Sequence, residues 1–417
     1  MGSTENLVYL TRSLIKSRFS EYYKKNGSTI VPPPSTEHRE FGFLLFAEGM
    51  MIRHRSFRQA SNLRKFIETT VPSDIYYSAA YYTDPEAPME KKGWIGSDLI
   101  FDIDADHIDT ECKRDHDRWL CVQCKTSGHG QMPQSCPNCT GQRLKMETWM
   151  CCECLEKAKE EVTRLIRLLN LDFGVDLDEM QVNFSGHRGY HLHVTSEEVR
   201  SLGSKERKEI VDYIIGTGLD MDLLGIYDHN GKPTISAAPN LGGLGWKGRI
   251  ARRMKKILSE ADRGELRKIG LKSNIIETIM RTRNEELRSQ TWNTIEGAGK
   301  QTWQSIFHRI VLLEAVCIDT VVTTDIHRLI RLPETLNGKT GLRAMRVDIE
   351  ELPRFNPLKQ AVAFDGVETI HIEEAPRFII GNNEYGPFSD AYETLPTAAA
   401  ILLLCKGRAQ PVVKKIA

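Results

Sequence analysis

Two aspartates, Asp102 and Asp104, follow a short apolar run, residues 99–101, and are separated by a single residue. If this segment is a strand, both carboxylates point to the same face of the sheet. Two carboxylates held so close repel each other, and a divalent cation with oxygen ligands relieves that repulsion. Two such cations can align a hydroxyl and a triphosphate for in-line phosphoryl transfer. The apolar run favours this interpretation over the alternative, a pair of solvated loop carboxylates.

The segment Ser185 to His191 reads Ser-Gly-His-Arg-Gly-Tyr-His and lies between two expected strands, residues 180–184 and 190–194. Its glycines permit a tight turn and the close approach of a ligand. Arg188 offers a planar fork suited to phosphate, Ser185 a hydroxyl and His191 a further donor. The turn alone is equally compatible with a hairpin that carries an incidental arginine. Together with the upstream aspartates, it predicts a metal site beside a triphosphate cradle.

Eight of the ten cysteines lie between residues 112 and 154, and this clustering favours metal binding over disulfides. An inner set has the two-knuckle spacing of a zinc ribbon: Cys121, Cys124, Cys136 and Cys139. An outer set surrounds it: Cys112, His116, Cys151 and Cys154. His129 as a replacement for His116, and Cys152 as a competing thiol, remain open. Both sets would be structural Zn²⁺ sites, because protein ligands fill all four positions.

The chain has 417 residues, with 56 acidic and 56 basic side chains, so any nucleic-acid surface must be a local patch. Residues 249–288 carry 12 Lys and Arg against 6 Asp and Glu, an excess of 12 − 6 = 6 positive charges. This excess indicates either a solvated helical face or a surface for a nucleic-acid backbone. No apolar run approaches the roughly 20 residues of a membrane span, so we expect a cytoplasmic protein without membrane contact.

Hydrophobic periodicity predicts alternating helices and strands along the chain. Strands are expected at residues 41–46, 50–57 and 75–82, and a helix at 155–171. Residues 205–305 are expected to be mainly helical. The strongly apolar segment 398–405 could be core or interface.

These motifs, taken in order, resemble the small catalytic subunit of archaeal and eukaryotic DNA primases over nearly the whole chain. The matching stretches are Arg39 to Phe41, Arg53 to Phe57, Asp98 to His107, Trp149 to Lys159, Ser185 to His191 and Asp319 to Leu342. Asn337 stands where family members usually have His, and His193 where they often have Trp. The inner zinc ribbon is longer than the minimal family zinc motif, which suggests a lineage-specific insertion.

The resemblance implies a third metal-binding aspartate at Asp319, a choice that spacing alone does not make over Asp325. It also implies nucleotide-binding roles for Ser185, Arg188, His191, Arg331 and Lys339. The catalytic ions would be Mg²⁺ or Mn²⁺, held by Asp102, Asp104 and Asp319. The implied partners are a single-stranded DNA template, nucleoside triphosphates and a primase large subunit in a heterodimer.

The implied fold is α+β, a mixed α/β primase core with an inserted zinc-binding module and a helical subdomain. The expected segments are core at 1–110, zinc module at 111–154, core at 155–245, helical subdomain at 246–308, and core with a C-terminal tail at 309–417. The implied activity is that of a nucleotidyltransferase, a DNA-directed RNA polymerase that makes short primers de novo during replication. Two rivals remain: a primase-polymerase of the same superfamily in repair or on a mobile element, and a non-catalytic zinc-ribbon adaptor that binds nucleic acid.

Overall fold

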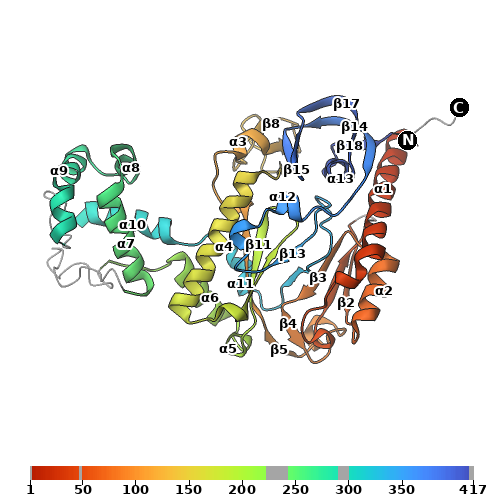
Figure 1. Cartoon of the computed structure of the whole chain (residues 1–417), viewed down its shortest axis with the longest axis horizontal. Helices are drawn as coiled ribbons and strands as arrows, with labels where there is room; N and C mark the ends of the chain where they lie inside the picture. Colours follow the sequence, from red (N-terminus) through yellow and green to blue (C-terminus); the bar gives the residue numbers. More distant parts are fainter. Residues whose placement is uncertain (1, 47–48, 222–242, 290–299, 413–417) are drawn as a thin grey trace. The chain divides into compact units, whose positions relative to one another are not determined.

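The computed structural model describes residues 2–46, 49–221, 243–289 and 300–412. The chain divides into two compact units, one formed by residues 1–163, 177–207 and 318–417, and the other by 164–176 and 208–317. The predicted mixture of helices and sheets is confirmed (Figure 1). Within the described residues, no helix is long and apolar enough to cross a membrane.

Two four-stranded antiparallel sheets form the centre of the first unit. The strand order of one sheet is β12 (Leu329–Arg331), β3 (Asp74–Ser78), β1 (Phe41–Leu44) and β2 (Met51–Arg55). The order of the other is β13 (Met345–Val347), β10 (Met180–Phe184), β11 (Gly189–Val194) and β6 (Leu99–Asp104). The strands β10 and β11 are the pair predicted on either side of the glycine turn, and β6 is an edge strand.

The single strand predicted over residues 75–82 is wrong, because the chain changes sheet within it. Residues up to Ser78 form β3, whereas β4 (Ala80–Tyr82) pairs with β5 (Trp94–Ser97). At the break, the Ala79 amide donates to the carbonyl of Arg328 instead of to a neighbour in β1 or β5. The aromatic and small apolar residues on both sides are buried, so the hydrophobic pattern continues through the break.

Helices and a smaller sheet cover the central sheets. The long helix α1 (Gly2–Asn26) and α2 (Ala60–Thr70) lie near the first sheet (Figure 1). The sheet β17 (Phe388–Pro396), β14 (Val367–Ala375) and β18 (Ala409–Pro411) packs on α13 (Thr397–Cys405). All residues of α13 up to Leu404 are buried, so the apolar segment 398–405 belongs to the core.

The cysteine-rich segment forms a small module within the first unit. It contains α3 (Lys113–His116) and the sheet β8 (Ser127–His129), β7 (Arg118–Cys121) and β9 (Leu144–Glu147). The module leads into α4 (Cys152–Phe173), which contains the helix predicted over 155–171.

A buried ionic network fixes the start of β6. Asp98 accepts hydrogen bonds from the Arg39 guanidinium at 2.6 Å and from the Tyr81 hydroxyl at 2.7 Å. Arg39 also donates to the carbonyls of Ser78 and Ala79, and the Arg207 guanidinium donates to the Asp98 carbonyl. Buried charges need such complete pairing, since an unpaired one is very costly. The network ties β6 to the β3–β4 break and so determines where the aspartates emerge.

The second unit is helical. It contains α7 (Gly245–Glu260), α8 (Arg263–Lys268), α9 (Ser273–Ser289), α10 (Lys300–Glu314), residues 208–215 of α6 (Ser204–Ile215) and the last part of α4. The unit extends further than the predicted range 246–308, because Tyr213 of α6 and Asp172 of α4 both hold the start of α7. The Trp246 indole donates to the Tyr213 carbonyl at 2.7 Å, and the Gly245 amide donates to Asp172 at 3.0 Å.

Candidate active site

The pairing of β6 with β11 brings the aspartates to the glycine turn. Asp102 lies opposite His191, and Asp104 lies opposite Gly189. A Cβ atom on Gly189 would lie 2.3 Å from the Ile103 carbonyl oxygen, so only glycine permits this approach of the strands. The turn itself needs Gly186 in the left-handed region, at φ +76°. The two glycines therefore position the turn against the acidic strand end.

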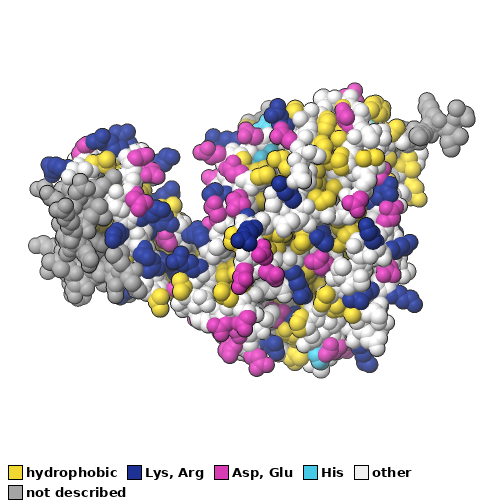
Figure 2. Space-filling model, in the orientation of Figure 1, with side chains coloured by type: hydrophobic (Ala, Val, Ile, Leu, Met, Phe, Trp, Pro, Cys, Tyr) yellow, Lys and Arg dark blue, Asp and Glu magenta, His cyan; other side chains and the backbone are white. Residues whose placement is uncertain are grey.

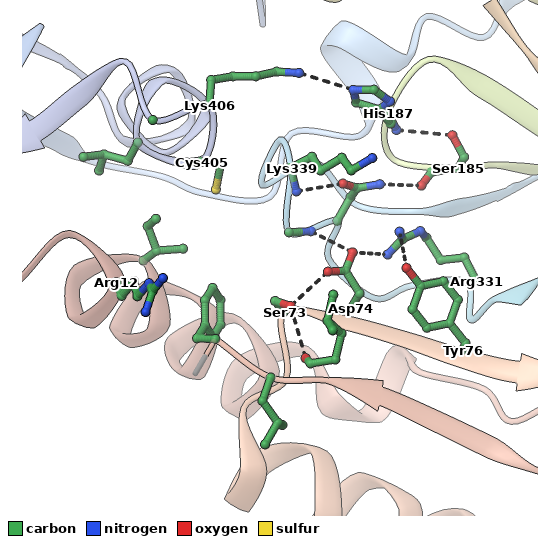
Figure 3. A pocket seen from close by; sticks show the side chains of 18 of the residues that line it. Arg12, Ser73, Asp74, Tyr76, Ser185, His187, Arg331, Lys339, Cys405 and Lys406 are labelled. Carbon is green, nitrogen blue, oxygen red and sulfur yellow. Dashed lines mark hydrogen bonds and ion pairs between the residues drawn. The ribbon is translucent and has the colours of Figure 1, made fainter. Parts of the chain in front are cut away.

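A cavity of about 720 Å³ opens beside these strands, a volume suited to a small-molecule ligand. Six of the predicted site residues line it: Asp102, Asp104, Ser185, His191, Arg331 and Lys339. They come from β6, the glycine turn, β11, β12 and the loop after β12, so segments far apart in the sequence meet here. Figure 3 shows Ser185, Arg331 and Lys339 among the residues that line the cavity. Arg188 and Asp319 were also predicted, but neither lines this cavity.

The carboxylates of Asp102 and Asp104 are buried close to other negative charges, which disfavours their ionised forms. Burial and the nearby charge of Asp319 raise the pKa of Asp102 to about 6. Burial also raises the pKa of Asp104, and the charge of Asp102 adds to that rise. Asp319 lies beside β6, since its amide donates to the Asp102 carbonyl at 2.8 Å, and it caps α11 (Thr320–Thr324). A divalent cation would stabilise the ionised form of this acidic group.

His191 is neutral in this setting. Burial, together with the charges of Arg331 and Arg328, lowers the pKa of His191 to about 3. Its Nε2 lies 3.7 Å from an Asp102 carboxylate oxygen. A neutral imidazole beside the acidic group can donate a hydrogen bond without adding charge.

A loop at residues 337–340 carries Lys339 into the lining of the cavity and is hydrogen-bonded to the glycine turn. The Asn337 amide donates to the Ser185 carbonyl at 3.1 Å, and its oxygen accepts from the Lys339 amide at 2.9 Å. The Thr340 hydroxyl donates to the Gly186 carbonyl at 2.6 Å. Asn337, where relatives of the resembled family usually have His, is buried and joins this loop to the glycine turn. The Asn337 side chain therefore connects the backbone of Ser185 to the backbone of Lys339.

Arg331 lines the cavity and is held by other polar groups that line it. Its guanidinium donates to Asp74 at 2.7 Å and to the Tyr76 hydroxyl at 3.2 Å (Figure 3). Asp74 also accepts from the Gly338 amide at 3.0 Å. The carboxylate of Asp74 therefore fixes both the arginine and the loop that carries Lys339.

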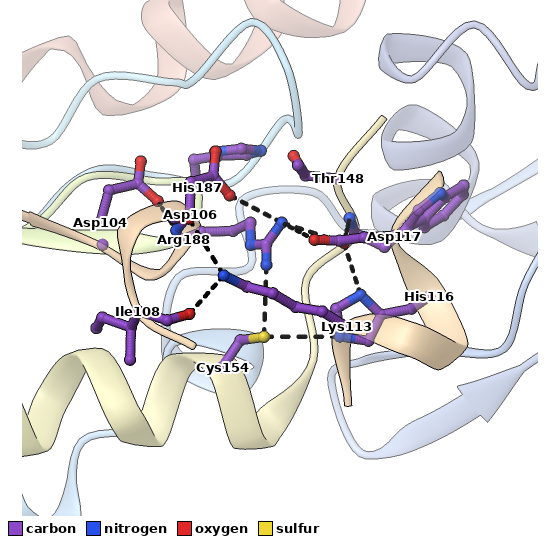
Figure 4. A network of polar contacts seen from close by, with 12 residues as sticks. Asp104, Asp106, Ile108, Lys113, His116, Asp117, Thr148, Cys154, His187 and Arg188 are labelled. Carbon is purple, nitrogen blue, oxygen red and sulfur yellow. Dashed lines mark hydrogen bonds and ion pairs between the residues drawn. The ribbon is translucent and has the colours of Figure 1, made fainter. Parts of the chain in front are cut away.

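Arg188 lies in a buried network on the other side of the turn (Figure 4). Its side chain is 0% exposed and pairs with Asp117 at 3.0 Å and with Asp106 at 2.9 Å. It also donates to the Sγ atom of Cys154 at 3.4 Å. Arg188 thus links the glycine turn to the outer cysteine set, a position different from the predicted phosphate contact.

Lys406 and His187 line the cavity and were not singled out from the sequence. The Lys406 ammonium lies 3.3 Å from Nε2 of His187 and donates to the Thr148 carbonyl at 2.8 Å (Figure 3). Burial, helped by the charges of Arg188 and Lys339, lowers the pKa of Lys406 to about 8. Lys406 follows the apolar helix α13 and belongs to no motif, so no sequence signal identified it.

The structure brings together both predicted cysteine sets. In each, the four ligand atoms all lie within 4.8 Å of one another: Cys121, Cys124, Cys136 and Cys139 in one set, and Cys112, His116, Cys151 and Cys154 in the other. Four sulfur–sulfur distances, two in each set, are 3.4 to 3.6 Å. A tetrahedral Zn²⁺ with bonds of about 2.3 Å needs about 3.8 Å between sulfurs, so both sets fit.

The outer set has a supporting group of its own. Nδ1 of His116 lies 2.7 Å from Asp117, which leaves Nε2 facing Cys154 at 3.6 Å. A carboxylate behind a ligating histidine fixes its tautomer and ring orientation. His129, the alternative ligand, lies outside both sets, and Cys152 is exposed.

Comparison with known proteins agrees with this geometry. A family model described as DNA primase small subunit matches residues 144–349. The chain is 34% identical to the "DNA primase small subunit PriS" of Methanothrix thermoacetophila, covering 96% of this chain and 98% of the relative. The corresponding protein of Archaeoglobus fulgidus is 33% identical, with 96% and 98% coverage, and that of Nitrosopumilus maritimus 30%, with 94% and 96%.

The match to these proteins implies a nucleotidyltransferase-type enzyme. The chain belongs to the DNA primase small subunit family.

Proposed function

We propose that this chain is the catalytic subunit of a DNA primase, which joins nucleoside triphosphates into short primers on single-stranded DNA. The observation that carries the proposal is a single cavity lined by both acidic and basic side chains. Asp102 and Asp104 line it together with Lys339 and Arg331. Such a cavity suits a nucleotide whose triphosphate bridges metal ions and fixed cations.

The acidic group fits divalent cations, because buried carboxylates with raised pKa values are stabilised by a cation. Bound Mg²⁺ or Mn²⁺ at Asp102, Asp104 and Asp319 would polarise the phosphate and activate the attacking hydroxyl. His191 donates a hydrogen bond to the triphosphate while remaining neutral. Ser185 and Lys339 hold the phosphates in place, and Arg331, oriented by Asp74, supplies a further fixed cation.

We assign Arg188 a positioning role. It is enclosed by Asp106 and Asp117, so a direct phosphate contact would require it to leave a carboxylate. Its contact with Cys154 couples the order of the turn to the order of the outer cysteine set. Lys406 adds a further cation to the lining of the cavity.

Both cysteine sets hold Zn²⁺ in this proposal, and neither Zn²⁺ takes part in the chemistry, because protein ligands fill every position. The enzyme acts in the cytoplasm as a heterodimer with a primase large subunit. Relatives that share almost the full length of the chain and are named as primase small subunits support this assembly. A zinc-ribbon adaptor would not need the acidic cavity.

The test compares aspartates that spacing alone could not distinguish. Asp319→Asn should abolish primer synthesis, as should Asp102→Asn, with zinc content and folding unchanged. Asp325→Asn is the matched control, because the Asp325 carboxylate accepts a hydrogen bond from the His327 amide at 2.9 Å and Asp325 does not line the cavity. Primer synthesis by the Asp102→Asn variant at the wild-type rate would overturn the proposal.

A further inference from the structure

A second concave surface lies within the helical unit, apart from the residues of the catalytic cavity. It has a volume of about 380 Å³ and runs between α7 and residues 164–172 of α4. Six cations line it, and we call it the basic groove: Arg164, Arg167, Arg249, Arg252, Arg253 and Lys256. Two carboxylates, Asp172 and Glu314, also line it, so the groove has a net charge of 6 − 2 = +4. Lys and Arg side chains gather on the visible face of this unit (Figure 2).

The spacing of the cations concentrates them on one helix face. Arg252, Arg253 and Lys256 lie three, four and seven residues after Arg249. This spacing places all four in one stripe along α7. Like charges at these spacings destabilise a helix. On α4, Arg164 and Arg167 are also three residues apart. A chain with no net charge overall thus concentrates positive charge in one hollow, where an anion would relieve the repulsion.

Part of the groove is held rigidly by the protein itself. Arg249 pairs with Asp172 at 3.2 Å, and Asp172 also accepts from the Tyr213 hydroxyl at 3.1 Å. Arg253 pairs with Glu314, and Arg164 donates to the carbonyl of Leu313 at 2.8 Å. These contacts consume both acidic groups of the groove and orient the arginines around it.

Other donors in the groove are left for a ligand. Nε of Arg249 is buried, and no described residue accepts a hydrogen bond from it. Arg167 and Lys256 are exposed and form no ion pair with any residue in the described part of the chain. A buried donor without a partner is unfavourable, so its presence beside free cations points to an anionic ligand.

We propose that the basic groove binds the phosphate backbone of single-stranded nucleic acid, the template of the proposed primase. The stripe from Arg249 to Lys256 spans seven residues, about 10 Å of helix. A stacked strand carries one phosphate per about 3.4 Å, so the stripe can contact roughly three consecutive phosphates. Guanidinium forks favour phosphate oxygens, which they bind with two hydrogen bonds. A backbone contact of this kind carries no sequence preference, as a primase template requires.

The experiment measures binding of a fluorescent oligothymidylate to the full chain at several salt concentrations. Arg167→Gln/Lys256→Gln removes the two exposed cations and retains side-chain length and helix propensity. Each lost phosphate contact on a single strand reduces the slope of log K against log salt by about 0.7, so the double variant should lose about 1.4. Lys247→Gln/Lys255→Gln is the matched control, because both lysines are exposed on α7 but do not line the groove. This control should keep the wild-type slope.

An equal decrease of the salt slope in both double variants would overturn the proposal, since it would indicate general attraction of the nucleic acid by the basic helix. An unchanged slope in the groove variant would also overturn it, because the two exposed cations would then make no phosphate contact. The inference rests on the proposed function only for the identity of the strand. In primer synthesis, the groove variant should show a raised KM for template and an unchanged rate at saturating template. A wild-type chain that makes no primers would refute the catalytic proposal, while the salt slope would still test the groove.

Discussion

Replacing Arg188 with methionine should destabilise the protein more than any other single change at the glycine turn. The side chain is 0% exposed and pairs with Asp117, which is 1% exposed. Methionine fills similar space but removes the guanidinium, so the buried Asp117 carboxylate keeps only the His116 imidazole and the Trp149 amide as partners. Breaking a buried ion pair in this way costs about 3–5 kcal/mol. That cost is a large share of the roughly 5–15 kcal/mol by which folded domains are stable.

The assay is urea unfolding followed by circular dichroism, together with zinc analysis of the folded protein. With slopes of about 1–3 kcal/mol per molar urea, the midpoint should fall by at least about 1 M. The outer zinc set should weaken as well, since Arg188 donates to Cys154 and Asp117 supports His116. Adding Asp117→Asn should recover part of the loss in stability, because the carboxylate that lost its guanidinium is then replaced by a neutral amide. A variant with the wild-type midpoint and zinc content but a much higher KM for nucleotide would refute the reasoning.

Three further predictions concern the cavity and the cysteine sets. The pKa of Lys406 is lowered to about 8, so its side chain loses its charge as the pH rises past 8. The kcat/KM for nucleotide should therefore fall above pH 8 in the wild type and stay level in Lys406→Arg. Identical pH profiles of the two proteins would contradict this prediction. Gly189→Ala should reduce primer synthesis at least about 100-fold, because the added Cβ would meet the Ile103 carbonyl. Near-normal activity would show that β6 and β11 can move apart without cost. Metal analysis should find two Zn²⁺ per chain and one in Cys121→Ser, whereas one Zn²⁺ in the wild type would remove a set.

Local chemistry made much of the fold predictable. The strand with the aspartates was visible because an apolar run precedes two alternating carboxylates, and a period of two places them on one face. The β10–β11 pair was visible because glycines separate two apolar segments. The break after Ser78 was not visible, since it depends on the Ala79 amide finding the distant Arg328 carbonyl. Periodicity reports burial, and burial continues through a change of sheet.

The site was predictable where its residues belong to motifs. The cysteine sets follow from ligand spacing, because short spacings leave few alternatives. The choice of Asp319 over Asp325 needed family resemblance, since the helix cap that holds Asp319 beside β6 depends on tertiary contacts. Lys406 reaches the cavity only because α13 is buried beside it, and a lysine after an apolar helix has no distinctive pattern.

The central claim, that this chain starts primers without a pre-existing end, is tested most directly by where labelled phosphate enters the product. The reaction contains the chain, single-stranded DNA, Mg²⁺ or Mn²⁺, and nucleotides labelled at the γ-phosphate. Pyrophosphate released at each extension step removes that label, so only the first nucleotide of a chain started de novo retains it. The account predicts short products that each carry one γ-label and that are absent with Asp102→Asn. Products labelled only from the α-phosphate, made by extending added primers, would contradict it.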